Sequence, residues 1–400
     1  MKSILFITAL DLWSMGKNKG APSLWQTIQG YARHDWIVYF LTSGKSDMSG
    51  ENLPSNIRII SIGNIWFQRA LKRKRLSFFI RPLWWLSFRM KMYRQASQIA
   101  KSEEIDLFYG YEIYGTPVAR RLSRKFGKPC ISRFQGTILA QKFKNPLWKI
   151  RHWHHYIGLK VPADLFIMTD DGTQGDKVLS CLGVDRSKVR FWMNGVNKEI
   201  FNPNFNTAEF KKSLHIPEQT KILLSVSRLV RWKRVDRIIK AMSQITSSFP
   251  NTILLIVGDG PERNKLEKLS RDLSLRDRIV FIGSLPHPET IHFINAADIF
   301  TSLYELSNVG NPLLEAMICG KCIVTLNNGD TAKYITNQKT GILLEENNPD
   351  ELPPIITRLL EDNTFRERLG KNAREFALKH FWTWDDRMDA EIEEAEELLH

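Results

Sequence analysis

The sequence predicts an α/β chain of two domains, each built on a parallel β-sheet with helices on both faces. The length of 400 residues favours two domains, because single domains average about 100 to 200 residues. Short apolar runs alternate with helical stretches twice along the chain, before and after a polar segment between Asn202 and Pro217. Alternation of this kind is typical of parallel sheets.

The apolar runs give the expected strands of each domain. Those of the first domain lie at residues 4–7, 36–41, 57–60, 105–109, 129–132 and 165–168, and those of the second at 222–226, 252–257, 279–282, 299–301 and 322–325. We predict domains at 1–203 and 204–380, with a C-terminal helix at 381–400 that could cross back to the first domain. Ligands bind beyond the carboxyl ends of such strands, so two facing domains would form a cleft.

Charge is unevenly distributed between the two halves. Residues 1–200 hold 32 Lys and Arg against 14 Asp and Glu, a net charge of +18, whereas residues 201–400 hold 25 against 29, a net charge of −4. A basic field attracts polyanions, so the first half is expected to face an anionic membrane, an anionic substrate or a nucleic acid.

The four cysteines, at positions 130, 181, 319 and 322, are too few and too scattered for a disulfide scaffold. The residues before the first strand do not resemble a cleavable signal, so we expect none, and no window is long and apolar enough for a membrane span. We expect a cytoplasmic protein whose Cys319 and Cys322 are buried, despite their redox-like spacing.

A cationic segment, Ser227–Lys233, follows one expected strand and precedes an amphipathic helix. Arg228 and Lys233 would therefore lie at the carboxyl end of a strand. Fixed cations there stabilise the charge that a nucleoside diphosphate gains as it leaves a sugar. We predict that Arg228 and Lys233 clamp a diphosphate; two solvated basic residues at a helix entrance would show the same pattern.

The segment Tyr304–Met317 predicts the start of a helix that faces a ligand. Asn311 is a suitable N-cap and Pro312 suits the first helical position, so free backbone N–H groups could hold an oxyanion. Gly310 allows close approach of the backbone to a ligand. Glu315 could accept hydrogen bonds from both hydroxyls of a ribose, although a Glu is also common near a helix N-terminus because of the helix dipole.

These segments, taken together, resemble the retaining family-4 glycosyltransferases of GT-B fold. The resemblance covers residues 161–345 and rests on motifs in a fixed order: Asn194–Asn197, Phe201–Pro203, Ser227–Leu229 with Lys233, Val257–Pro261, Phe281–Leu285, Ala297–Asp298 and Pro312–Lys321. It implies two Rossmann-like domains facing across a cleft and a nucleotide-sugar donor.

The resemblance also implies roles for single residues. Arg228 and Lys233 would bind the donor diphosphate, and Glu315 the donor ribose. The base would be bordered by Gly283, Ser284 and Leu285. Gly20, in the loop after the first strand, would lie near the donor phosphate and the acceptor.

Two positions depart from the family pattern. The family usually has two glutamates eight residues apart, the first of which binds the donor sugar, whereas Glu305 and Glu315 are ten apart. Either Glu305 keeps this role in a longer loop, or the sugar is held by Asn308, Asn311 and the backbone of Val309 and Gly310.

Gln135 is the second departure, because many relatives have a His there near the reacting centre. Gln135 cannot act as a base. Retaining transfer in this family is thought to need no strong base, so Gln135 could orient the sugar or the acceptor. A loop glutamine bonded to its own backbone is the alternative.

No metal and no cofactor are expected besides the nucleotide sugar, which is a co-substrate. His152, His154 and His155 are surrounded by aromatic residues and have no carboxylate near them in sequence. Asp170 and Asp171 are interpreted as a turn or helix cap after a strand.

A basic and aromatic segment lies between Glu51 and Glu103, which enclose no acidic residue. Its cations are Arg69, Lys72, Arg73, Lys74, Arg75, Arg81, Arg89, Lys91 and Arg94, and its aromatic residues are Trp66, Phe67, Phe78, Phe79, Trp84, Trp85, Phe88 and Tyr93. Each cation contributes about 1 kcal/mol near an anionic leaflet, so we predict a membrane surface. The alternative places the aromatic residues in the core.

We therefore predict a hexosyltransferase-type glycosyltransferase that moves a sugar, with retention, from a UDP- or GDP-linked donor to a glycan or lipid-linked glycan. Its products would belong to a surface polysaccharide such as capsule or lipopolysaccharide, or to a glycolipid. The enzyme would be peripheral on the inner face of the cell membrane and would bind no nucleic acid. The alternatives are a nucleotide-sugar epimerase or hydrolase of the same fold, and a non-catalytic glycan or membrane adaptor.

Overall fold

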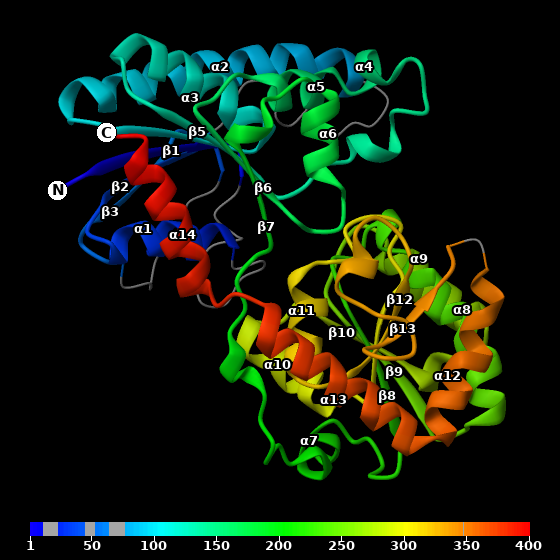
Figure 1. Ribbon diagram of the computed structural model, residues 1–400. Helices are drawn as coiled ribbons and strands as arrows, with labels where there is room; N and C mark the ends of the chain where they lie inside the picture. Colours follow the sequence, from blue (N-terminus) through cyan, green and yellow to red (C-terminus); the bar gives the residue numbers. More distant parts are fainter. Residues whose placement is uncertain (11–22, 45–52, 64–76, 347) are drawn as a thin grey trace. The chain divides into compact units, whose positions relative to one another are not determined.

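The computed structural model describes residues 1–10, 23–44, 53–63, 77–346 and 348–400, and Figure 1 shows the chain as a ribbon. It consists of two compact units. The first unit contains residues 1–170, 174–194 and 384–400, and the second contains residues 171–173 and 195–383. Each unit is an α/β structure around one parallel sheet, as predicted.

The sheet of the first unit has seven parallel strands in the order β3-β2-β1-β4-β5-β6-β7. The strands are β1 (Ser3–Thr8), β2 (Ile37–Thr42), β3 (Ile57–Ser61), β4 (Leu107–Tyr111), β5 (Cys130–Phe134), β6 (Leu165–Thr169) and β7 (Val189–Trp192). All six predicted strands are present. The prediction missed β7, because this edge strand has only four half-buried residues and Arg190 interrupts its apolar run.

Helices cover both faces of this sheet (Figure 1). On one face, α1 (Ser23–Arg33) and α14 (Trp384–Glu397) pack together, and on the other α2 (Ser77–Ser102) packs with α3 (Glu112–Phe126). Shorter helices follow β5 and β6, namely α4 (Trp148–Arg151), α5 (Trp153–Lys160) and α6 (Gly175–Cys181).

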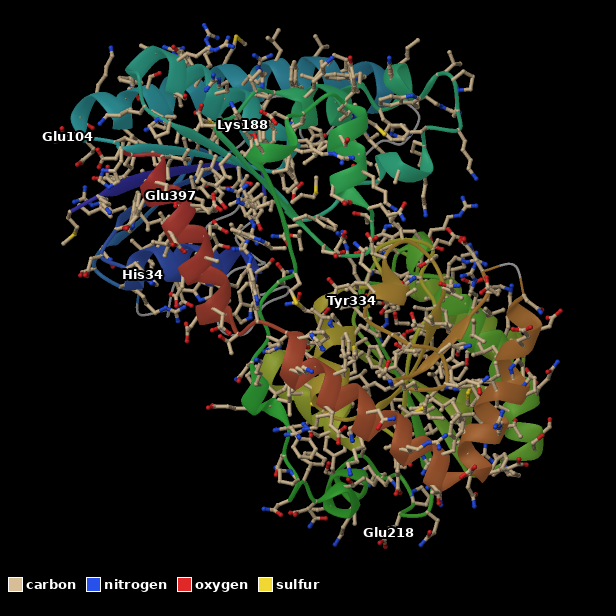
Figure 2. The ribbon with its side chains drawn as sticks, viewed as in Figure 1. His34, Glu104, Lys188, Glu218, Tyr334 and Glu397 are labelled. Atoms are coloured by element: carbon tan, nitrogen blue, oxygen red, sulfur yellow. The ribbon has the colours of Figure 1, made fainter. Side chains whose placement is uncertain are left out.

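A buried ionic cluster attaches α14 to its sheet. The Glu391 carboxylate is fully buried between the guanidinium groups of Arg133 and Arg387, and it also accepts a hydrogen bond from the Tyr109 hydroxyl. At the surface, His34, the residue after α1, lies beside α14, where its Nε2 is 3.0 Å from Asp389 Oδ1 (Figure 2). The last helix of the chain is thus an integral part of the first unit.

The sheet of the second unit has six parallel strands in the order β10-β9-β8-β11-β12-β13. They are β8 (Lys221–Val226), β9 (Thr252–Val257), β10 (Ile279–Gly283), β11 (Ile299–Ser302), β12 (Cys322–Leu326) and β13 (Ile342–Leu344). The five predicted strands are confirmed. The sequence did not indicate β13 because this strand has only three residues.

Helices again cover both faces. One face carries α8 (Val235–Ser248), α9 (Arg263–Asp272) and α12 (Leu352–Glu361), and the other carries α10 (His287–Ala296), α11 (Asn311–Ile318) and α13 (Asn363–His380). The helix α7 (Thr207–Ser213) packs on α10. Across the described ranges of both units, no helix combines the length and apolarity that a membrane crossing requires.

Candidate functional site

Lys233 lies beyond the carboxyl end of β8 and contacts the loop that follows β11. Its Nζ donates a hydrogen bond of 3.2 Å to the carbonyl oxygen of Ser307. The ammonium also lies 3.8 Å from the centroid of the Tyr304 ring and 4.4 Å from that of Trp232. Because burial disfavours its charged form, the pKa of Lys233 is lowered to about 7. An anion placed here would restore the charge on this lysine.

Asp171 supplies the opposite charge nearest to Lys233. Its Oδ1 accepts hydrogen bonds from the backbone N–H of Thr173 at 3.1 Å and from the Thr173 hydroxyl at 2.6 Å. Burial raises the pKa of Asp171 to about 6, against the effect of these hydrogen bonds and of the Lys233 charge. The sequence interpretation of a turn was right, but it missed the proximity to Lys233, which lies 62 positions further along the chain.

Two glycines allow this segment to approach the loops of the second unit. A Cβ added to Gly329 would lie 1.9 Å from the carbonyl oxygen of Gly172, and both glycines have positive φ angles, 58° and 89°. The carbonyl oxygen of Asp171 accepts a hydrogen bond of 3.0 Å from the N–H of Val309. Only glycine fits such a close contact of two backbones without strain.

Glu305 is bonded to arginine in this structure. Its carboxylate pairs with Arg234, and Arg237 Nη2 lies 3.9 Å from its Oε1. Arg234 itself adopts a left-handed φ of 45° and also pairs with Asp236 at 3.0 Å. The predicted sugar-binding carboxylate is therefore fixed in place by cations from the start of α8.

Asn308 shapes the loop rather than presenting its amide to a ligand. The side chain is buried, its Oδ1 accepts from the Tyr304 N–H at 3.1 Å and the Ser302 hydroxyl at 3.2 Å, and its Nδ2 donates to the Tyr304 carbonyl at 2.8 Å and to Asn328. Val309 is buried too. Ser307, between them and Glu305, has a strained φ of 60°.

The helix after this loop begins one residue earlier than predicted. Gly310 occupies the N-cap position, so Asn311 and Pro312 are the first two residues of α11. A glycine cap offers no side chain to the first N–H groups of the helix. The prediction that Asn311 is the N-cap is wrong because Gly310, with its extended φ of −94°, already makes the turn into the helix.

Glu315 has a partner that the sequence interpretation missed. It is only 5% exposed, and its Oε1 lies 2.7 Å from Nε2 of His287 at the start of α10. This hydrogen bond raises the pKa of His287. The strand β10 leads through Gly283, Ser284 and Leu285 directly to His287, so the predicted base-bordering segment and the predicted ribose-binding residue are close together. The sequence did offer one indication of this partner, because His287 follows the predicted base-bordering segment by only two residues.

The remaining predicted residues differ in their placement. Arg228 follows β8 and has an exposed side chain. Gln135 lies in the first unit, where its N–H donates to Glu112 Oε1 at 2.8 Å and its amide donates to the Tyr111 hydroxyl. Glu112 has a left-handed φ of 63°, a strained conformation of the kind found at functional sites. Gly20 lies outside the described residues.

The basic aromatic segment is described only from α2 onward. Trp66, Phe67 and the cations between residues 69 and 75 lie outside the described residues. Trp84 and Phe88 are buried in the core, as the alternative interpretation expected, and the exposed apolar side chains are instead Leu83, Leu86 and Met90, which are 49 to 52% exposed.

Cysteines and metal ligands give no further site in the second unit. Cys319 and Cys322 are buried, as expected, and burial raises the pKa of each to about 12. Within the described ranges, no three His, Cys, Asp or Glu side chains are grouped so as to hold a metal ion.

Comparison with known proteins assigns the second unit to a family. The sequence profile of the family described as Glycosyl transferases group 1 matches residues 206–376. An uncharacterized glycosyltransferase of Methanocaldococcus jannaschii is 33% identical over 47% of this chain and 50% of its own length. The sulfoquinovosyl transferase of Arabidopsis thaliana is 28% identical over 59% of this chain and 44% of its own length. This chain thus spans about half the length of the curated relatives it matches.

Solved structures resemble the whole chain. Sucrose-phosphate synthase from Thermosynechococcus elongatus superimposes with a TM-score of 0.80 at 20% identity, covering 100% of this chain and 99% of that one. Anabaena HepE, solved with UDP and glucose, gives 0.76 at 18% identity, covering 99% and 100%. At these identities the likeness shows the fold, which is GT-B. With this fold and the profile match, residues 206–376 belong to the glycosyl transferases group 1 family.

Proposed function

We propose that this protein is a retaining glycosyltransferase that moves a sugar from a UDP- or GDP-linked donor to a glycan or lipid-linked glycan. The product would be part of a surface polysaccharide or a glycolipid. The observation that carries the proposal is the enclosed ammonium of Lys233 at the carboxyl end of β8, next to the loop that leads into α11.

The environment of Lys233 suits a leaving diphosphate. Burial lowers the pKa of this lysine to about 7, so the lysine is only partly charged before a ligand arrives. A diphosphate would favour the ammonium, and the interaction would strengthen as negative charge develops on the leaving group. Arg228, which follows β8 and is exposed, could neutralise the outer phosphate. These two cations would replace a metal ion in the proposed reaction.

Glu315 suits the ribose of the donor. Its buried carboxylate is held by His287, and a carboxylate can accept hydrogen bonds from two neighbouring hydroxyls at once. His287 would remain bonded to one oxygen and fix the orientation of the carboxylate. The sequence Gly283–Leu285 lies next in the chain and would border the base.

Glu305 is our candidate for contact with the donor sugar. The ion pair with Arg234 holds its carboxylate at the carboxyl edge of the sheet, and its side chain is still 38% exposed. Asn308 is the weaker candidate, because its amide is occupied by protein groups. Gln135 would orient the acceptor or the sugar through the amide that Tyr111 holds.

The acceptor is proposed to lie on an anionic membrane surface. The exposed Leu83, Leu86 and Met90 are spaced along one side of α2, and Arg94 continues on that side. Apolar and basic side chains together favour the bilayer interface. Flotation with anionic liposomes at low salt tests this part: the protein should float, and Leu86→Asp combined with Met90→Asp should abolish flotation. Failure of the unmodified protein to float would refute membrane docking.

The donor site is tested by calorimetric titration of UDP and GDP, without added metal. We expect one nucleotide to bind. Glu315→Ala should weaken that binding at least about tenfold, since a hydrogen bond to a charged group contributes about 1.5 to 3 kcal/mol. Glu289→Ala, at an exposed position of α10, is the matched control and should bind normally.

Two measurements separate the competing functions: the titration tests the adaptor function, and conversion of a nucleotide sugar tests the epimerase or hydrolase function. If neither UDP nor GDP binds, the adaptor function becomes the better explanation. If one binds and a nucleotide sugar is converted without any acceptor present, the protein is an epimerase or hydrolase instead.

A further inference from the structure

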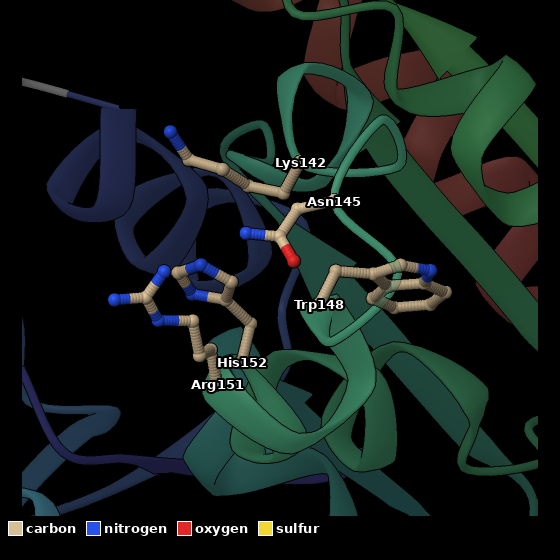
Figure 3. Close-up of a pocket in the computed structure, with 5 residues that line it drawn as sticks. All are labelled: Lys142, Asn145, Trp148, Arg151 and His152. Carbon is tan, nitrogen blue, oxygen red and sulfur yellow. The ribbon is translucent and has the colours of Figure 1, made fainter.

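A hollow in the first unit is not explained by the donor site. It has a volume of about 430 Å³ and lies between the turn after β5 and the start of α5. Its lining consists of Lys142, Asn145, Trp148, Arg151 and His152. Figure 3 shows the Asn145 amide between the Trp148 indole on one side and the His152 imidazole on the other, with the charged ends of Lys142 and Arg151 on the His152 side.

The local backbone directs the Asn145 amide into the hollow. The Asn145 Oδ1 accepts a hydrogen bond of 2.9 Å from the N–H of Leu147, and the backbone carbonyl of Asn145 accepts one of 2.9 Å from Trp148. The oxygen end of the side chain is therefore used within the turn. Its NH₂ group points toward His152 and is available as a donor to a ligand (Figure 3).

No carboxylate of the described residues neutralises the charge in this hollow. The sequence between Glu112 and Asp164 contains no Asp or Glu. Across the described ranges, neither Lys142 nor Arg151 pairs with a carboxylate. The pKa of His152 is lowered, first by burial and then by the charges of Lys142, Arg151 and Arg81. The neutral imidazole adds a polar group without adding charge.

Trp148 also forms one wall of a second hollow, of about 390 Å³. This neighbour is mainly aromatic and apolar, with cations at its rim; its lining includes Phe143, Tyr156, Leu182, Lys149 and Lys160. The indole is held edge-on against Phe143 at 4.9 Å and Tyr156 at 5.6 Å between ring centroids. A fixed aromatic face beside unpaired cations and an amide donor can hold a ring and an anionic group at once.

We propose that the hollow lined by Lys142, Asn145, Trp148, Arg151 and His152 binds a phosphate-bearing sugar of the acceptor. Lys142 and Arg151 bind the phosphate, the sugar ring stacks on Trp148, and Asn145 and His152 bond to its hydroxyls. The proposal rests on the proposed function, because it names the class of acceptor. Leu147 and Ile150, 58% and 62% exposed, would allow a lipid chain to leave the site.

Fluorine NMR on the full chain tests the site directly. The protein contains 12 tryptophans, so 5-fluorotryptophan labelling gives resolved probes, and Trp148→Phe assigns the signal of Trp148. Glucose 1-phosphate should shift this signal in a saturable way, and glucose without the phosphate should not at the same concentrations. Lys142→Gln and Arg151→Gln should each weaken binding at least about tenfold, since each removes a charge-assisted bond to phosphate.

Lys144→Gln is the matched control, because Lys144 is exposed two residues away and lines neither hollow. It should leave binding of glucose 1-phosphate within about twofold of the unmodified protein, since an exposed charge outside the site contributes little. The other fluorotryptophan signals, unchanged in each variant, show that the variant is folded. Equal losses in Lys144→Gln and Lys142→Gln would overturn the proposal in favour of a general basic surface.

The source of the phosphate is distinguished with vesicles. Phosphatidylinositol in phosphatidylcholine vesicles joins a lipid, a phosphate and a polyol ring, and phosphatidylglycerol at the same molar fraction supplies the same charge without the ring. Preference for phosphatidylinositol over both phosphatidylglycerol and glucose 1-phosphate assigns a lipid-linked acceptor. Binding of glucose 1-phosphate alone assigns a soluble one.

Two results would refute the site. The first is a Trp148 signal that shifts with neither glucose 1-phosphate nor phosphatidylinositol vesicles. The second is a single-stranded oligonucleotide that binds at Trp148 more tightly than these two ligands do, because single-stranded nucleic acids also bind to cations and aromatic rings. Calorimetric titration of the same samples with UDP and GDP distinguishes failure of the acceptor site from failure of the proposed function. Nucleotide binding with no response at Trp148 refutes only the acceptor site. A response at Trp148 without nucleotide binding refutes only the proposed transfer.

Discussion

The loops around Lys233 and the hollow beside Trp148 both collect cations, but they do so in opposite ways. In the second unit the charged groups are paired: Glu305 bonds to Arg234, and Glu315 bonds to His287. In the first unit Lys142 and Arg151 lack a described carboxylate partner. Paired groups are held in fixed positions before a ligand arrives, whereas unpaired cations gain most when an anion arrives. This difference is consistent with the two proposals, a donor site at Lys233 and an acceptor site at Trp148.

The largest effect is expected from the buried ionic cluster around Glu391 in the first unit. Glu391→Ala should lower the free energy of unfolding by about 3 to 5 kcal/mol, because it leaves the buried guanidinium groups of Arg133 and Arg387 uncompensated. Urea denaturation followed by circular dichroism measures this loss. Glu396→Ala is the control: its pair with Lys2 is about 40% exposed, so less than about 1 kcal/mol should be lost. Equal losses would show that α14 is not attached through this cluster.

The next largest effect should come from the paired site. Lys233→Ala should weaken the preferred nucleoside diphosphate about 100-fold, because a charge-assisted contact in a buried setting contributes about 2 to 3 kcal/mol. Calorimetry measures the change, and Lys240→Ala, at an exposed position of α8, should bind normally. If Lys233→Ala binds as tightly as the unmodified protein, the enclosed ammonium is only structural and the contrast between the two regions disappears.

The pH dependence of nucleotide binding sharpens the comparison further. The pKa of Lys233 is about 7 in the free protein, and a bound diphosphate raises it, so binding takes up a proton above pH 7. Affinity for the nucleotide should therefore fall as pH rises from about 7, by up to about tenfold per pH unit. The phosphate of the nucleotide is not the cause, because its second ionisation, with a pKa near 6, is largely over at these pH values. Asp171, with a pKa of about 6, ionises below this range.

Lys233→Ala is the control for that profile and should show no decline in affinity over the same range. Titrations at several pH values, each in two buffers of different ionisation heat, also measure the proton uptake. A profile that declines equally in the variant would assign the effect to another group.

The smallest effect is expected at the thiols. Cys130, Cys319 and Cys322 are buried, and Cys181 is exposed at the rim of the second hollow. A maleimide should label one thiol per folded chain, at Cys181, without changing nucleotide affinity. Mass spectrometry counts the labels and calorimetry checks the binding. Rapid labelling of Cys319 or Cys322 would mean that the second unit opens far more readily than its packing indicates.

The sequence identified the parts of the proposed donor site that lie close together in the chain. Lys233 lies in the short segment between its strand and the next helix, and Glu315 lies one turn into its helix, so local periodicity and turn chemistry indicated their places. Their partners were missed for a common reason. Asp171 and His287 approach Lys233 and Glu315 across separate elements, and a sequence does not indicate which side chains of two distant loops will meet.

The two candidate groups of the predicted sugar-binding loop differ in their surroundings, which only the fold shows. The spacing of ten residues between Glu305 and Glu315 left both Glu305 and Asn308 as candidates. The structure shows that the amide of Asn308 bonds to Tyr304 and Ser302, whereas the carboxylate of Glu305 is 38% exposed beside Arg234. The role of either residue in binding a sugar stays a prediction. Gly20 is not among the described residues, so its predicted role stays a prediction.

By itself, the sequence determined that this chain has two parallel-sheet units, because alternating apolar runs and helical stretches report burial along one segment at a time. It also determined which strand ends carry cations and carboxylates. The tertiary structure alone decided that Glu391 pairs with Arg133, that Trp84 and Phe88 face the core, and that Lys142 and Arg151 have no carboxylate partner among the described residues. The physical reason is that pairing and burial are properties of side chains brought together from distant segments, whose distances only the packed sheets and helices define.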